Sequence, residues 1–229
     1  MSYITVIGGG SWGTALAILL AKKDYDVTLW AFEKEVVDTI KEKRVNEVFL
    51  PDVTVPGNLN VTNSLEDCVP KARYVVSVVP TQFVRGVFGS VSGLLNDDAV
   101  VVSASKGVEK GTLKTVSDVL SELMRNKIAV LSGPSFAREV VKRVPTAVTL
   151  AAYDAEVAYK LQEIFNTEYF RVYTHFDVKG VEIGGALKNV LAIASGICEG
   201  LELGRNTRAA LITRGIAEML RLGLKMGAD

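Results

Sequence analysis

Residues 3–17 read YITVIGGGSWGTALA, and this stretch decides the fold of the chain. The apolar run at 3–7 predicts a strand, the glycines predict a tight turn, and the residues from Ser11 onward predict a helix. Gly8, Gly10 and Gly13 have the G-x-G-x-x-G spacing, whose glycines allow the tight turn, the approach of a pyrophosphate and close helix–strand packing, respectively. The stretch therefore indicates a dinucleotide whose diphosphate lies at a helix N-terminus, where free N–H groups favour negative charge.

The glycine motif alone is not specific, because glycine-rich turns also arise from ordinary turn chemistry. The residues that follow it make the interpretation more specific. A second apolar run at 26–31 ends about twenty residues after the glycines, where this kind of site contacts a ribose. Strand, helix and second strand together form the βαβ unit that the motif requires. We therefore predict that the chain binds a dinucleotide.

Composition excludes several classes of protein. The chain has 229 residues, of which 48% are hydrophobic and 23% are charged, which is ordinary for a globular protein. Its 26 basic residues equal its 26 acidic residues, so we expect no nucleic-acid partner and no anionic membrane partner. The longest apolar runs are of strand length and no basic segment leads into an apolar one at the start, so we expect no membrane span, no signal peptide and a cytoplasmic location.

The cysteines and the histidine do not form a metal-binding pattern. Cys68 and Cys198 lie far apart in the sequence, and His175 is the single histidine. Because this spacing matches no zinc or iron site, we expect no metal. The two cysteines are interpreted as free, buried thiols of a protein in a reducing compartment.

Strand and helix patterns alternate through most of the chain. A charged helix is expected at 33–44 and a loop around 51–57. Further strands are expected at 74–79, 99–104, 128–131, 146–151 and 170–173, with helices at 84–95, 113–124, 136–142 and 154–165. This alternation predicts an α/β, Rossmann-like fold, with a doubly wound and mainly parallel sheet covered on both faces.

The pattern changes beyond residue 178, where no strand is expected. Residues 181–201 and 206–226 read as two long helices, the second with an apolar stripe. We therefore predict a dinucleotide-binding domain at 1–178 and the start of an all-helical substrate domain at 179–229. A ligand site is expected in the cleft between them, outside the carboxyl ends of the strands.

Two short segments follow strands at the place where such a cleft would lie. Lys106 is in the segment SASKG at 103–107, and Ser135 is in SGPSFA at 132–137. Lys106 is a candidate for contact with the cofactor, or it is a solvated loop lysine. Ser135 is a candidate for substrate contact, or it is an ordinary helix N-cap. The residue types alone leave both alternatives open.

A third segment, EIGGALKNV at 182–190, lies in the first long helix. Adjacent glycines inside a helix each cost about 1 kcal/mol relative to alanine, so Gly184 and Gly185 need a reason such as close approach of a ligand or another backbone. Gly184 and Lys188 are four residues apart and share a helix face. Lys188 is therefore a candidate for contact with a substrate, or it lies beside a tight helix–helix contact and extends into solvent.

These segments together resemble one family. The glycine turn at 8–17, SKG at 105–107, SGPSFA at 132–137, GGALKNV at 184–190 and ALITRG at 210–215 occur in the order seen in the bacterial NAD(P)-dependent glycerol-3-phosphate dehydrogenases. The resemblance extends over the whole chain. Several long motifs in sequence are more specific than any one of them, and they favour the functional interpretation of Lys106, Ser135 and Lys188.

The resemblance implies an oxidoreductase of glycerophospholipid metabolism that transfers hydride reversibly between NAD(P)H and dihydroxyacetone phosphate to give sn-glycerol 3-phosphate. It also implies a homodimer. It implies that Lys188 is the general acid and base and that Lys106 stabilises the developing alkoxide and contacts the nicotinamide side. The substrate contacts implied are Lys106, Gly133, Ser135 and Lys188, and the cofactor contacts are Gly8, Gly10, Ser11, Trp12, Gly13, Phe32, Lys106 and Ala137.

One departure from the family concerns the choice between NAD and NADP. Position 32 is often basic or polar in the family, but here it is Phe32, followed by Glu33. Phe32 can stack on adenine but cannot pair with a 2′-phosphate, which Glu33 would repel. We favour NAD as the cofactor, and the nearby basic residue Lys34 leaves NADP as an alternative.

The second departure concerns the end of the sequence at Asp229. Related enzymes continue beyond this point with segments that hold the glycerol and phosphate of the substrate. We therefore expect dinucleotide binding with weak or no turnover, and self-association through the apolar faces of the last two helices. The alternatives are a non-catalytic dinucleotide-binding module and another two-domain dehydrogenase of the hydroxyacid or ketopantoate type.

Overall fold

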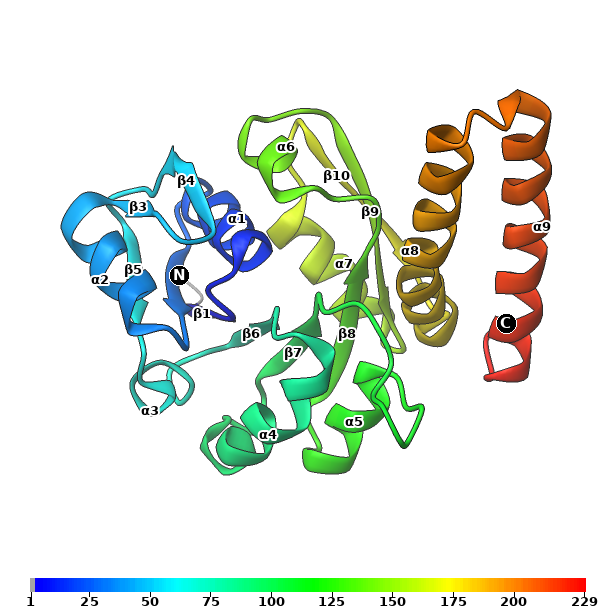
Figure 1. The fold of residues 1–229 in the computed structure, drawn as a ribbon. Coiled ribbons are helices and arrows are strands. Elements are labelled where there is room, and N and C mark those ends of the chain that lie inside the picture. The colour runs from blue at the N-terminus through cyan, green and yellow to red at the C-terminus, as the bar shows by residue number, and fades with distance from the viewer. Residues whose placement is uncertain (1–2) are drawn as a thin grey trace.

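Residues 3–229 are described by a computed structural model, in which an eight-stranded sheet occupies the centre of the main domain (Figure 1). Its strands, in the order in which they lie side by side, are β10 (Phe170–His175), β9 (Thr146–Ala152), β8 (Lys127–Ser132), β7 (Val100–Ser103), β6 (Tyr74–Ser77), β1 (Tyr3–Ile7), β2 (Asp26–Trp30) and β5 (Leu59–Thr62). Neighbouring strands are parallel except β8 and β9, which are antiparallel. The prediction of a doubly wound, mainly parallel sheet is confirmed.

Both faces of this sheet are buried, which explains why β6 and β7 are runs of valine rather than alternating sequences. One core cluster joins the sheet to α1 (Ser11–Ala21), α2 (Lys34–Lys43) and α7 (Ala155–Phe165). The other joins it to α3 (Leu65–Cys68), α4 (Thr81–Val91) and α5 (Val116–Leu123). Within β1, Val6 belongs to the first cluster and Ile7 to the second, as the two-residue period of a strand requires.

The region between α2 and β6 was predicted less well. Instead of a loop around 51–57, β4 (Leu50–Thr54) forms an antiparallel pair with β3 (Val45–Asn46). The edge strand β5 and the short helix α3 were also not expected. Pro51 argues against a strand in sequence terms, but it is tolerated here because β4 lies in a two-stranded ribbon rather than in the middle of a sheet.

The cysteine prediction needs one correction. Both cysteines are free, and Cys68 is buried as expected, with burial raising the pKa of its thiol to about 11. Cys198 is only half-buried, because it lies on the projecting part of α8 (Val178–Gly200), beyond the turns that contact the sheet.

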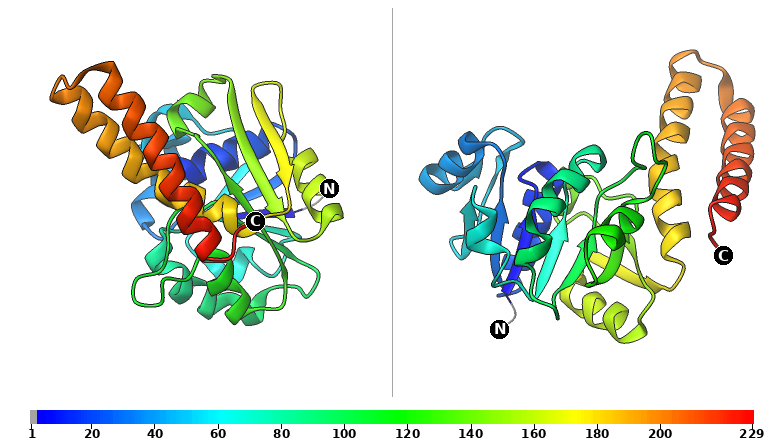
Figure 2. Two further views of the ribbon diagram at one scale, coloured as in Figure 1. Left: turned by 90° about the vertical axis from the view of Figure 1, so that its right-hand side faces the viewer. Right: turned by 90° about the horizontal axis from the view of Figure 1, so that it is seen from below.

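Two long helices follow the sheet, as predicted. The first turns of α8 pack on the sheet beside β8 and β9, and the rest pairs with α9 (Gly204–Lys225) as a hairpin that projects from the main domain (Figures 1 and 2). Large apolar side chains stay exposed along this hairpin, among them Val190, Ile193, Ile197, Ile216 and Leu220. Such a surface favours association with another apolar surface, so self-association remains a prediction.

Among the described residues, α8 is the one helix long and apolar enough to cross a membrane by length and composition. Its beginning, however, carries Glu182, which is buried against α5 in the main domain. We therefore interpret α8 as part of the globular structure.

Candidate dinucleotide and catalytic site

The three motif glycines occupy positions that require or tolerate glycine for different reasons. Gly8 has a φ of 128°, and its N–H donates to the Trp30 carbonyl at 3.0 Å. A Cβ at Gly13 would lie 1.9 Å from the Gly8 carbonyl oxygen, so α1 can start this close to β1 only with glycine there. A Cβ at Gly10 would meet no protein atom within 4 Å, which leaves space for a ligand to approach the backbone.

The start of α1 is available to an anion. Gly10 is the N-cap and provides no side-chain cap, and Ser11 and Trp12 form the first, half-buried turn. The N–H groups of a first helical turn have no partner within the helix, and they carry the positive end of its dipole. This turn can therefore hold a diphosphate.

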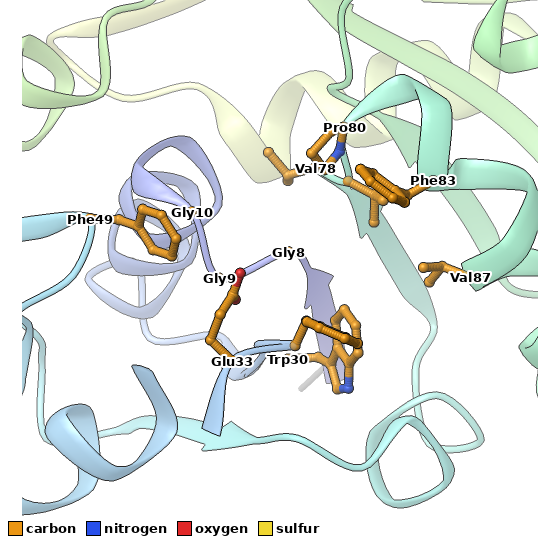
Figure 3. Close-up of a pocket in the computed structure, with 12 residues that line it drawn as sticks. Gly8, Gly9, Gly10, Trp30, Glu33, Phe49, Val78, Pro80, Phe83 and Val87 are labelled. Carbon is orange, nitrogen blue, oxygen red and sulfur yellow. The ribbon is translucent and has the colours of Figure 1, made fainter. Parts of the chain in front are cut away.

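A pocket of about 470 Å³ lies beside the glycine turn, at the carboxyl ends of β1, β2 and β6 (Figure 3). From β1 the chain continues to β2 and β5 on one side of the sheet and then returns to β6 on the other side of β1. In folds of this type, ligands bind at the point where the strand order reverses in this way. The pocket is lined by Gly8, Gly9, Gly10, Trp30, Phe32, Glu33, Phe49, Val78, Val79, Pro80, Phe83 and Val87. Exposed aromatic faces, open glycine backbone and one carboxylate fit an adenine, a diphosphate and a ribose hydroxyl.

The structure therefore brings the predicted residues Gly8, Gly10 and Phe32 into one pocket. Phe49 and Phe83 also line it, and the sequence reasoning missed both. Phe83 is 65% exposed, although it follows an apolar strand by only a few residues. An aromatic residue shortly after the carboxyl end of a strand was the available signal for Phe83, whereas Phe49 lies between the helix expected at 33–44 and the loop expected around 51–57, where no element was predicted.

The segments that contain Lys106 and Ser135 meet next to α1. The Lys106 ammonium donates to the Gly133 carbonyl at 3.2 Å and to Ser135 Oγ at 3.1 Å. It also lies 5.6 Å from the centre of the Trp12 ring. Lys106 is thus held by specific partners and is not a solvated loop lysine.

Ser135 does not serve as the N-cap of the helix after it. Helix α6 (Ala137–Val141) has Phe136 at its N-cap, while the Ser135 hydroxyl donates to Gly133 at 3.3 Å. Gly133 has a φ of 153°, and a Cβ there would lie 2.9 Å from the Val148 Cα. The loop therefore needs glycine at position 133, where it packs against β9, and the predicted contact Ala137 is half-buried shortly after it.

The surroundings of Lys106 disfavour its charged form. Burial, and to a smaller extent the positive charge of Lys188, lower the pKa of Lys106 to about 8. The two lysines therefore interact electrostatically although they belong to different segments. A cation whose pKa is this close to neutrality can respond to the arrival of an anion or to developing negative charge.

Lys188 lies on α8, half-buried, and its ammonium donates to Asn189 Oδ1 at 3.3 Å. The adjacent glycines have separate surroundings. A Cβ at Gly185 would lie 2.2 Å from Ser132 Oγ, so α8 approaches the end of β8 closely there. A Cβ at Gly184 would meet nothing within 4 Å, so the face that Gly184 shares with Lys188 stays open in the chain as described.

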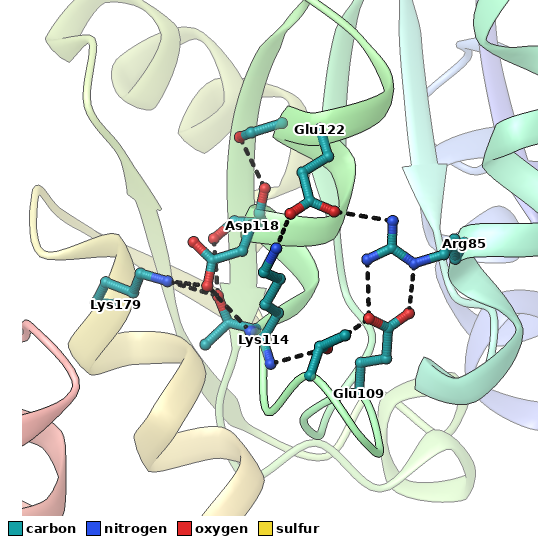
Figure 4. A network of polar contacts seen from close by, with 10 residues as sticks. Arg85, Glu109, Lys114, Asp118, Glu122 and Lys179 are labelled. Carbon is teal, nitrogen blue, oxygen red and sulfur yellow. Dashed lines mark hydrogen bonds and ion pairs between the residues drawn. The ribbon is translucent and has the colours of Figure 1, made fainter.

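A network of ion pairs supports the loop that carries Lys106 (Figure 4). Arg85 on α4 donates to both oxygens of Glu109 at 2.8 Å, which lowers the pKa of that carboxyl to about 2. Arg85 also pairs with Glu122, which in turn pairs with Lys114. Because Glu109 lies three residues after Lys106, this network limits the movement of the loop.

A second group of contacts holds α8 against α5. Lys179 pairs with Asp118, and the Glu182 carboxylate accepts from the Ser117 N–H at 2.8 Å and from its hydroxyl. Burial raises the pKa of Glu182. These contacts lie at the beginning of the helix that carries Lys188, and the sequence reasoning did not find them because the partners are about sixty residues apart.

Comparison with known proteins identifies relatives of the whole chain. Residues 3–158 match the family described as NAD-dependent glycerol-3-phosphate dehydrogenase N-terminus, and residues 177–229 match its C-terminus. A glycerol-3-phosphate dehydrogenase [NAD(P)+] of Geobacter sulfurreducens is 55% identical over 99% of this chain and 69% of its own length. A crystal structure of glycerol-3-phosphate dehydrogenase from Coxiella burnetii has a TM-score of 0.94 and 39% identity, over 100% of this chain and 70% of the other.

A more distant likeness concerns the fold alone. A ketopantoate reductase from Ralstonia eutropha has a TM-score of 0.67 at 18% identity, over 99% of this chain and 76% of the other. The ketopantoate type of dehydrogenase therefore shares the architecture of this chain.

Proposed function

This chain belongs to the NAD-dependent glycerol-3-phosphate dehydrogenase family, and we propose that it catalyses reversible hydride transfer between NAD(P)H and dihydroxyacetone phosphate. The product of reduction is sn-glycerol 3-phosphate, a precursor for phospholipid synthesis. The observation that carries the proposal is the cluster of Lys106, Gly133 and Ser135 next to Trp12, with Lys188 acting electrostatically on Lys106.

The cofactor is NAD or NADP, and its reduced form supplies the hydride. In our proposal the diphosphate lies on the turn formed by Gly8, Gly10 and Gly13, with Ser11 and Trp12 at the helix start. Phe32 covers the adenine, and Lys106 and Ala137 contact the nicotinamide half of the dinucleotide. The open space at Gly10 and the aromatic lining of the pocket support this assignment.

The protein contributes a proton and positive charge to the reaction. During reduction Lys188 donates a proton to the carbonyl oxygen, which becomes the hydroxyl of the product, and during oxidation Lys188 takes that proton back. Lys106 stabilises the alkoxide character that develops on this oxygen. Gly133 and Ser135 hold the substrate through their backbone and hydroxyl groups.

We also propose the division into domains at 1–178 and 179–229, which is supported by the start of α8 at Val178 directly after the last strand. A cytoplasmic location is supported by the two free cysteines. A homodimer is supported by the exposed apolar side chains of α8 and α9.

Oxidation of NADH in the presence of dihydroxyacetone phosphate tests the proposed function. Turnover that depends on both compounds supports it. Binding of NADH without turnover would instead support the non-catalytic dinucleotide-binding module, and turnover with a 2-keto acid alone would support the hydroxyacid or ketopantoate type.

We expect NADH to be preferred over NADPH. Glu33 lines the pocket and would repel a 2′-phosphate, whereas the Lys34 ammonium pairs with Asp38 at 2.6 Å on the surface. Steady-state kinetics with both cofactors should give a higher kcat/KM for NADH than for NADPH. Glu33→Gln should lower the ratio of these two kcat/KM values by about tenfold, because one like-charge contact with the 2′-phosphate is lost. A kcat/KM for NADPH tenfold above that for NADH would contradict this preference.

Binding of the phosphorylated substrate should weaken as pH rises through about 8, the pKa of Lys106. Below this pH the ammonium is charged, and above it the amine is neutral, while the substrate phosphate is already a dianion above about pH 7. Calorimetry with sn-glycerol 3-phosphate in the presence of NAD should show an affinity about tenfold lower at pH 9 than at pH 7. Lys106→Arg keeps its charge over this range and should abolish the dependence; an unchanged profile in this variant would assign it to another group.

A further inference from the structure

Asn46 is a fully buried amide that contacts the glycine turn from outside it. Its Nδ2 group donates to the Gly9 carbonyl at 2.8 Å and to Thr14 Oγ1 at 2.8 Å. Its Oδ1 atom accepts from the Phe49 N–H at 3.1 Å. Because Gly9 offers only an acceptor and Phe49 only a donor, these partners define the orientation of the amide.

The bond to Gly9 has a consequence for the neighbouring N–H. The Gly9 carbonyl and the Gly10 N–H belong to one trans peptide, so they point in opposite directions. Asn46 and the Thr14 hydroxyl, which donates at 3.3 Å, hold the carbonyl toward the buried side. The Gly10 N–H is thereby directed to the other side, and Gly10 lines the pocket.

The bond to Phe49 acts on a second part of the same pocket. Phe49 is 38% exposed and lies in the turn between β3 and β4, where it lines the pocket with the glycines. Figure 3 shows its ring beside Gly9 and Gly10. One side chain thus connects the glycine turn to an aromatic wall of the pocket, although 37 residues separate Asn46 from Gly9.

We propose that Asn46 is a positioning residue for the dinucleotide: it orients the Gly9–Gly10 peptide toward the diphosphate and holds Phe49 against the adenosine half. This inference rests on the proposed binding of the cofactor at the glycine turn. Asn46 does not itself touch the cofactor but acts on it through Gly10 and Phe49.

The test is the affinity for NADH and for ADP-ribose, measured by fluorescence and calorimetry well below the unfolding temperature of each variant. Asn46→Ala should weaken both ligands by the same factor, at least tenfold, because the contacts affected belong to the part they share. Phe49→Ala should weaken both by a smaller factor. In the double variant the loss should be less than the product of the two single losses, because Asn46 acts partly through Phe49.

Asn58→Ala is the matched control. The Asn58 amide donates to the Ala21 carbonyl at 2.8 Å, at the opposite end of α1 from the glycine turn. Loss of this bond also affects the packing of α1 but should leave both affinities unchanged. Asn46→Asp, which keeps an acceptor for the Phe49 N–H but removes the donors to Gly9, should weaken both ligands less than Asn46→Ala does and more than Asn58→Ala does, and it replaces the alanine variant if alanine prevents folding.

Different results would overturn different proposals. A parent chain that fails to bind NADH would overturn the proposed cofactor site and this inference with it. A parent that binds, together with an Asn46→Ala variant of equal affinity, would overturn the inference alone. An equal loss in Asn58→Ala would also overturn it, because the effect would then follow from the general packing of α1.

Discussion

Replacing Lys188 by alanine should lower kcat for the reduction of dihydroxyacetone phosphate by about 10³-fold, the usual contribution of a general acid. The affinity for NADH and the unfolding temperature should change little. Within residues 3–229, the Lys188 ammonium donates to Asn189, its neighbour on the same helix, so truncation breaks no hydrogen bond between elements. Stopped-flow or steady-state assays of NADH oxidation measure the loss.

Two further variants make the Lys188 result specific. Lys188→Arg keeps a positive charge but cannot give up a proton near neutral pH, so it should be nearly as inactive as the alanine variant. Lys225→Ala, an exposed lysine at the end of α9, should retain parental activity. An alanine variant at 188 within tenfold of the parent would show that another group transfers the proton.

Alanine substitutions at Gly10 and Gly13 should differ in their effects on NADH affinity and on the free energy of unfolding. Gly13→Ala places a Cβ 1.9 Å from the Gly8 carbonyl oxygen, so either α1 or β1 must move. We expect a loss of about 3 kcal/mol in the free energy of unfolding and a loss of NADH binding of at least a hundredfold, because the turn is distorted. Thermal unfolding and fluorescence titration measure the two effects.

Gly10→Ala should weaken NADH binding by at least tenfold while the free energy of unfolding changes by less than about 0.5 kcal/mol. Its φ of −65° suits alanine, and the added methyl group meets no protein atom within 4 Å. The methyl group would instead occupy the space through which a diphosphate approaches the backbone. Unchanged NADH affinity in this variant would place the diphosphate elsewhere.

Most of the fold could be predicted because its signals are local. Strands such as β7 are continuous apolar runs, and helices such as α7 have a regular apolar face. The failures lie between residues 45 and 68, where β3, β5 and α3 are two to four residues long. Elements this short contain too few residues to show a period, and their pairing depends on partners elsewhere in the chain.

The sequence by itself determined the glycine turn at the start of α1, the α/β class and the candidate lysines Lys106 and Lys188, because each follows from residue type and spacing within one segment. Tertiary structure alone decided that Ser135 binds Lys106, that Phe49 and Phe83 line the pocket, and that Asn46 supports the glycine turn. These contacts join residues that lie far apart in the sequence. The order of the strands in the sheet brings them together, and no local pattern of residues records that order.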